Sequence, residues 1–205
     1  MRFAGVRAKS LIARNSLSWR QSAALVLAAL LSSAWPPLDR AQANPPSEYQ
    51  LKAAFLFNFA KFVEWPAASF SDPRSPFVIC ILGADPFGHA MDDALLGKMI
   101  GERGVAIERS KELADARHCQ MVFVSSSEKS RVAEILDGLK GTSTLVVGET
   151  EGFAAAGGMI QFVLEDNRVR FLINTDATDR AGLKVSSKLL SLARLVHDAP
   201  KNDRS

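Results

Sequence analysis

The chain has 205 residues, 47% hydrophobic and 23% charged, which excludes a disordered polymer and suffices for a packed core. Its formal net charge is +3, but the first 43 residues hold six of the 25 Lys and Arg residues and only one of the 22 Asp and Glu residues. The remaining chain carries 19 basic and 21 acidic groups, a formal charge of −2, so its composition gives no support for nucleic-acid binding.

Residues 1–43 have the order of a secretory signal peptide: cationic residues, an apolar run at 23–31, and then Ala41-Gln42-Ala43. The run is about half the roughly 20 residues that a membrane-spanning helix needs, and no cysteine directly follows it to accept a lipid. We therefore expect cleavage after Ala43 and a product that is free in the periplasm. The rest divides into a flexible lead-in (44–48), one domain (49–197) and a flexible tail (198–205).

The domain opens with apolar residues at helical spacing over 49–63, and Trp65-Pro66 ends this predicted helix. The continuous apolar run 77–82 is typical of a strand buried on both faces of a parallel sheet. Asp85-Pro86 is then expected to cap and open a second helix. That helix would carry Phe87, Met91, Leu95 and Leu96.

Further strands are predicted at 105–108, 119–124 and 144–147. A brief polar helix at 112–116 precedes the second of these strands, and Ser127 is expected to cap a longer helix that precedes the third. Strands that alternate with helices in this way are typical of a parallel sheet.

The pattern changes at 159–164 and 169–174, two apolar segments separated by four polar residues, which predict an antiparallel hairpin. From Thr178 onward the spacing predicts a C-terminal helix. Its buried face would hold Leu183, Val185, Leu189, Leu190, Leu192 and Leu195. The predicted fold class is α/β, with a mixed sheet that is parallel in its N-terminal part, a C-terminal antiparallel hairpin, and helices on both faces.

Cys80 and Cys119 are the cysteines of the chain, and an even count in an oxidising compartment favours a disulfide. The alternative is a pair of buried free thiols, because both cysteines lie in apolar segments. A disulfide requires the two Cα atoms to approach within about 7 Å across neighbouring strands.

The sequence offers little for catalysis. His89, His118 and His197 stand outside metalloprotease and hydrolase motifs. Cys119 follows His118 directly, but neighbours in a strand point to opposite faces, so the two are not expected to form a nucleophile and base pair. We therefore predict no catalytic residue, no cofactor and no metal site.

Two loops follow predicted strand ends, where open α/β sheets bind ligands. The loop 83–88 lacks the glycine spacing of a dinucleotide site and has a proline where a phosphate loop needs a backbone N–H. The serines at 125–127 could hold a small anion, although an ordinary helix cap explains them more simply.

Arg168 and Arg170 lie on one face of a predicted strand, an arrangement that suits a carboxylate, a phosphate or an acidic patch on a partner. A solvated face paired to Gln161 or Glu165 explains them equally well. The candidate partner- or ligand-binding residues are Arg168, Arg170, Asn174, Lys184, Ser186, Ser187 and Lys188.

Several blocks of the chain resemble the YfiR-like periplasmic proteins in the same order. They are Tyr49 to Pro66, Cys80 to Gly83 with Asp85 to Gly88, His118 to Gln120, Gly157 to Phe162, and Ala181 to Leu190. The resemblance extends over about residues 49–196, nearly all of the predicted mature chain.

The resemblance implies a periplasmic repressor, and no enzyme, that binds the periplasmic sensory domain of a membrane-bound diguanylate cyclase of the YfiN type. Cyclic di-GMP, biofilm formation and motility would be the outputs. It also implies a homodimer and sequestration by an outer-membrane lipoprotein of the YfiB type. Studied relatives carry a second cysteine pair in the C-terminal half, whereas this chain has no cysteine after Cys119, so redox control does not carry over directly. The competing hypothesis is a periplasmic small-anion receptor that feeds a membrane sensor and uses the strand-end loops near Gly83 and Ser125, with Arg168 or Arg170 as an anion clamp.

Overall fold

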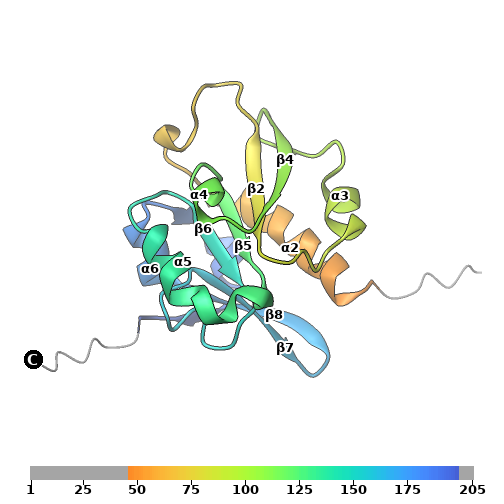
Figure 1. The fold of residues 1–205 in the computed structure, drawn as a ribbon, viewed down its shortest axis with the longest axis vertical. Coiled ribbons are helices and arrows are strands. Elements are labelled where there is room, and N and C mark those ends of the chain that lie inside the picture. Colours follow the sequence, from red (N-terminus) through yellow and green to blue (C-terminus); the bar gives the residue numbers. More distant parts are fainter. Residues whose placement is uncertain (1–45, 199–205) are drawn as a thin grey trace, which may run out of the picture. The chain divides into compact units, whose positions relative to one another are not determined.

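The computed structural model describes residues 46–198 (Figure 1). The predicted signal peptide and residues 199–205 of the predicted tail lie outside this range. The helical segments are α2 (Glu48–Phe62), η1 (Ala67–Ser69), α3 (His89–Leu95), α4 (Leu113–Ala116), η2 (Ser126–Arg131), α5 (Val132–Gly138), α6 (Thr175–Arg180) and α7 (Ser187–Leu190). The strands are β1 (Val63–Glu64), β2 (Phe77–Leu82), β3 (Met99–Ile100), β4 (Arg103–Ser110), β5 (Met121–Val124), β6 (Leu145–Gly148), β7 (Ile160–Glu165), β8 (Arg168–Asn174), β9 (Lys184–Val185) and β10 (Arg194–Val196).

The main sheet has eight strands in the order β10-β8-β7-β6-β5-β2-β4-β3. Strands β4, β2, β5, β6 and β7 run parallel, β8 is antiparallel to β7, and β10 is parallel to β8. Strand β3 closes the other edge as an antiparallel hairpin with β4, and β1 and β9 form a separate small sheet. The predicted fold class is therefore confirmed.

The core lies on both faces of the sheet, because β2, β5 and β6 are buried along their whole length. Helices α2 and α3 cover one face, and α4, α5 and α6 lie on the other (Figure 1). On the first face, Phe55 and Phe59 of α2 contact Phe162 of β7 and Phe171 of β8, with ring centroids 5.0 to 6.2 Å apart. Helix α2 is thus fixed to the strands by aromatic contacts.

Helix α2 begins with a capping box. The Ser47 hydroxyl accepts from the Gln50 N–H at 3.3 Å, and the Gln50 side-chain oxygen accepts from the Ser47 N–H at 2.7 Å. The predicted lead-in therefore ends at Ser47.

The second helix differs from the prediction, since α3 begins at His89 and leaves Phe87 and Leu96 outside it. The Asp85 carboxylate accepts from the Phe87 N–H at 2.7 Å and forms an ion pair with Arg109, so it closes a local turn and does not cap a helix. Gly88 has a positive φ of 52°, which interrupts any earlier helix.

The cap near residue 127 also differs. The capping residue is Ser125, whose hydroxyl accepts from the Ser127 N–H, and it opens η2 before α5 begins at Val132.

The predicted antiparallel hairpin is confirmed, and Asp166 and Asn167 form its two-residue turn with φ values of 49° and 59°. Positive φ at both positions is the type I′ geometry that matches strand twist.

The prediction of a helix from Thr178 onward is wrong. Gly182, with a φ of 69°, ends the turn after α6, and the chain then forms β9, α7 and β10. Leu192 and Leu195, expected in the buried face, are 67% and 48% exposed. Their helical spacing was misleading because short elements of different type happened to place leucines at similar intervals.

Candidate functional site

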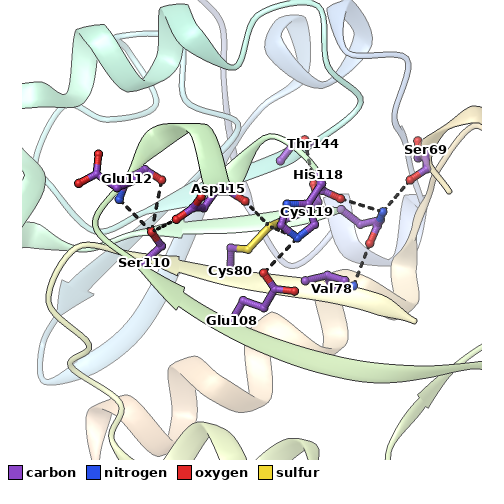
Figure 2. The surroundings of a disulfide bond; sticks show 11 residues. Ser69, Val78, Cys80, Glu108, Ser110, Glu112, Asp115, His118, Cys119 and Thr144 are labelled. Atoms are coloured by element: carbon purple, nitrogen blue, oxygen red, sulfur yellow. Dashed lines mark hydrogen bonds and ion pairs between the residues drawn. A yellow bond between two sulfur atoms is a disulfide. The ribbon is translucent and has the colours of Figure 1, made fainter. Parts of the chain in front are cut away.

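A disulfide joins Cys80 in β2 to Cys119, which lies two residues before β5 (Figure 2). The two Cα atoms are 6.0 Å apart, and both cysteines are 2% exposed. The predicted pairing is confirmed, and the alternative of free thiols does not hold.

The segment around the disulfide is held by buried hydrogen bonds. The Gln120 side chain accepts from the Val78 N–H at 2.8 Å and donates to the Ser69 carbonyl at 2.6 Å. The Thr144 hydroxyl donates to the Cys119 carbonyl at 2.9 Å. A pocket of about 570 Å³ lies beside this segment, and Cys119 and His118 contribute to its wall.

Glu108 and His118 stand next to the disulfide (Figure 2). Glu108 in β4 is the register partner of Cys80, and its Oε2 lies 3.0 Å from the His118 Nε2. His118 and Cys119 precede β5, so strand alternation does not separate them, and the His118 Nε2 lies 4.0 Å from the Cys119 Sγ. The fold thus gathers four potential metal ligands that sequence spacing did not indicate.

The strand order reverses between β2 and β5, the position where open α/β sheets bind ligands. The loops at this position are 83–88 and 125–127. They contact each other directly, because the Ser127 hydroxyl accepts from the Ala84 N–H at 2.9 Å. A Cβ at Gly83 would lie 2.5 Å from that hydroxyl oxygen. Of the serines at 125–127, Ser125 therefore caps η2, and Ser127 holds the two loops together.

A buried ion pair lies at the same edge of the sheet. Lys52 of α2 contacts Glu149, which follows β6, at 2.7 Å, and each side chain is 6% exposed. Glu48 lies 2.5 Å from Lys52, and the Ser126 N–H donates to Glu149 at 3.2 Å. Burial acts to lower the pKa of Lys52, but hydrogen bonds and attraction from Glu149 and Glu48 outweigh it and raise this pKa. The sequence analysis missed this pair, although residue 52 falls on the buried stripe of α2 with Leu56.

Arg168 and Arg170 are exposed and share one face of β8, as predicted. Strand register adds Arg194 of β10 to this face, since Arg194 is the partner of Leu172, two residues beyond Arg170. Arg194 forms an ion pair with Glu165 at 2.9 Å. We call Arg168, Arg170 and Arg194 the arginine face; the sequence analysis missed Arg194 because it assigned that segment to a helix.

The arginine face is remote from the loops 83–88 and 125–127, which follow β2 and β5. Four strand spacings separate β8 from β2, roughly 19 Å at about 4.8 Å each. One small anion could not contact Gly83 and Arg168 together, so the geometry does not favour the anion-receptor hypothesis.

The remaining candidates lie elsewhere. Lys184 pairs in register with Glu64, Ser186 caps α7, and Ser187 and Lys188 are exposed on that short helix. Asn174 is fully buried, where it caps α6 and donates to the carbonyl of Ala154 and to Asp198. Asp198, the first residue of the predicted tail, also forms an ion pair with Arg180.

The chain matches the model of the YfiR/HmsC-like family over residues 49–194. The chain belongs to this family. The YfiR/HmsC-like match includes every element from α2 to the start of β10, and therefore contains the disulfide, the buried ion pair and the arginine face. Family membership connects the protein with the regulation of diguanylate cyclase signalling.

Solved structures offer weaker likenesses. A conserved domain protein from Vibrio cholerae has 11% identity and a TM-score of 0.45, with coverage of 73% of this chain and 60% of that protein. An ABC domain in complex with L-Trp from Streptococcus pneumoniae has 6% identity and a TM-score of 0.40, with coverage of 60% and 55%. This chain thus spans less than two thirds of either protein, and TM-scores below 0.5 do not establish a shared fold.

Among the helices of residues 46–198, none has the length and apolarity to cross a bilayer.

Proposed function

We propose that this YfiR/HmsC-like protein is exported to the periplasm, binds the periplasmic sensory domain of a membrane-bound diguanylate cyclase of the YfiN type, and holds the cyclase inactive. The family match over residues 49–194 is the observation that supports this function. The protein would thereby lower cyclic di-GMP without performing chemistry of its own. A homodimer, and sequestration by an outer-membrane lipoprotein of the YfiB type, belong to the same proposal.

The arginine face is our candidate for the contact with the cyclase. Guanidinium groups recognise carboxylates through paired hydrogen bonds, so neighbouring arginines suit an acidic patch on a partner. Leu164, on the other face of the same hairpin, is 54% exposed and adds apolar area at the tip. A contact at this hairpin would therefore combine charge recognition with apolar burial.

The proposed function is tested by deleting the gene and measuring cellular cyclic di-GMP. We expect the level to rise and to return when the intact gene is restored. A gene with Leu27→Arg and Leu30→Arg in the predicted leader should fail to restore it, because the apolar run required for export is broken. An unchanged level after deletion would refute the proposed function.

The contact surface is tested by reversing charge with Arg168→Glu and Arg170→Glu together. We expect binding to the purified sensory domain to weaken at least tenfold, with unfolding unchanged, because both side chains are exposed. Lys111→Glu with Lys129→Glu, two exposed positions outside β8, is the matched control. Equal binding by both variants would place the contact elsewhere and leave the cyclase proposal to the deletion experiment.

A further inference from the structure

The disulfide lies within a set of four groups that could bind a metal ion. One ligand atom from each of Cys80, Glu108, His118 and Cys119 lies within 4.8 Å of all the others. Figure 2 shows the Glu108 carboxylate and the His118 imidazole directed toward each other beside the two sulfurs. Two cysteines, one histidine and one carboxylate are ligand types that Zn²⁺ takes in tetrahedral sites.

The fold fixes this arrangement through three separate constraints. Parallel pairing of β2 with β4 places Cys80 beside Glu108, and pairing of β2 with β5 brings the residues before Met121 alongside. The bonds of Gln120 and Thr144 then hold the backbone of the segment that carries His118 and Cys119. The positions of the four residues therefore do not depend on the disulfide alone.

We propose that the reduced protein binds one Zn²⁺ through the thiolates of Cys80 and Cys119, the Nε2 of His118 and the carboxylate of Glu108. A dithiol reduces the disulfide to two thiols and is itself oxidised to a disulfide. Zn²⁺ then displaces the two thiol protons, which pass to solvent, and four metal bonds form. Metal binding and the disulfide exclude each other, because the same two sulfurs serve both.

The distances suit this exchange. Zn–S bonds of about 2.3 Å and Zn–N or Zn–O bonds of about 2.0 to 2.2 Å place tetrahedral ligands roughly 3.3 to 3.8 Å apart. The Oε2 of Glu108 and the Nε2 of His118 are already 3.0 Å apart, and the His118 Nε2 is 4.0 Å from the Cys119 Sγ. The sulfurs must separate once their bond is broken, because tetrahedral Zn–S bonds place two sulfurs about 3.8 Å apart.

Access differs between the two halves of the site. The side chains of His118 and Glu108 are 55% and 46% exposed, whereas the cysteines are 2% exposed. A metal ion can thus reach the imidazole and carboxylate from solvent and then bind the sulfurs below them. Cys119 is also one of the residues that line the pocket, and we expect a small reductant to approach the disulfide from there.

The alternative is that Glu108 and His118 form only a surface ion pair, which contributes little in any redox state. The two interpretations differ in what reduction does to metal affinity. The oxidised protein retains only the imidazole and carboxylate, so it should bind Zn²⁺ weakly. The reduced protein should bind one equivalent.

The experiment uses the purified, naturally processed protein, reduced with a water-soluble phosphine under argon and compared with untreated protein. Zn²⁺ affinity is measured by competition with a chromophoric chelator, and native mass spectrometry should show one zinc gained with two protons lost. Co²⁺ as a probe should give a thiolate charge-transfer band and the intense visible bands of tetrahedral coordination. We expect affinity at least 100-fold higher after reduction.

Variants separate a four-ligand site from binding by the thiols alone. His118→Ala and Glu108→Gln should each lower the Zn²⁺ affinity of the reduced protein at least tenfold, since losing even a supporting group costs about 10- to 100-fold. His89→Ala, at another exposed histidine, is the matched control and should leave affinity unchanged. Near-UV circular dichroism of the oxidised variants verifies that they fold. Equal affinity before and after reduction, or affinity unaffected by both ligand variants, would overturn the proposal, and neither result depends on a cyclase.

Discussion

Removing either charge of the buried Lys52–Glu149 pair should destabilise the fold strongly. Both side chains are 6% exposed, and breaking such a pair from one side costs about 3 to 5 kcal/mol because the remaining charge is buried without compensation. Lys52→Met leaves Glu149 with the Ser126 N–H and the Tyr49 hydroxyl, and Glu149→Gln leaves Lys52 with Glu48. These remaining partners place each single variant at the lower end, about 3 kcal/mol.

The double variant, Lys52→Met with Glu149→Gln, removes both charges and should cost about 4 kcal/mol, less than the sum of the single variants. The coupling energy is then about 2 kcal/mol, which is within the range measured for contacting residues. Urea unfolding followed by the fluorescence of Trp65, which packs against Phe77 at 4.8 Å, gives these free energies. With a slope of about 2 kcal/mol per M, each single variant should shift the midpoint by about 1.5 M.

The exposed pair Lys140 and Asp137 is the matched control, since each side chain is 75% exposed. Its coupling should be too small to resolve, because solvent screens a pair of exposed charges. Additive effects at Lys52 and Glu149, or single variants that cost less than about 1 kcal/mol, would refute the assignment of a strong buried pair.

Two further predictions concern the disulfide and the C-terminal segment. Replacing both cysteines, Cys80→Ala with Cys119→Ala, should lower the free energy of unfolding by about 4 kcal/mol in the chain-entropy picture, since the disulfide closes a loop with a sequence separation of 39. Urea unfolding measures this difference. A loss below about 1 kcal/mol would contradict the prediction. His197 has a raised pKa because it hydrogen-bonds Asp176 at 2.9 Å, and the same bond lowers the pKa of Asp176. The contribution of His197 to stability is full below its unfolded pKa of about 6.5 and is lost as pH rises through the raised pKa. The contribution of Asp176 to stability is lost as pH falls below about 4. Amide exchange in β10, corrected for its intrinsic pH dependence, should therefore be faster at pH 8 than at pH 6, and His197→Ala should abolish the difference.

The sequence predicted the sheet because its central strands carry an unambiguous signal. Residues 77–82 are apolar without interruption, and a run of that length is typical of a strand buried on both faces of a covered parallel sheet. The prediction of a helix after Thr178 was wrong because the signal there was ambiguous. The leucines of that region satisfied a helical period, but periodicity reports neither the positive φ of Gly182, which is a local feature of the backbone, nor the pairing of β10 with β8, which is a tertiary feature.

The candidate site was predictable only in part. An even cysteine count in an oxidising compartment predicted the disulfide, and alternation predicted the shared face of Arg168 and Arg170. The neighbours of the disulfide were out of reach, because Glu108 is brought to Cys80 by the register of β2 and β4. No local pattern in either segment specifies that register.

The loops that follow β2 and β5 differ from the β7–β8 hairpin in which contacts a bound molecule would disturb. A ligand between the loops 83–88 and 125–127 would have to displace the hydrogen bond from the Ala84 N–H to the Ser127 hydroxyl, next to Ser126, whose N–H donates to the buried Glu149. Arg168 and Arg170 already lie in solvent, so a partner with an acidic surface can engage them without breaking a buried contact. Recognition at the hairpin therefore costs the fold less than recognition at the loops, and this difference is our physical reason for proposing that a cyclase would contact the arginine face.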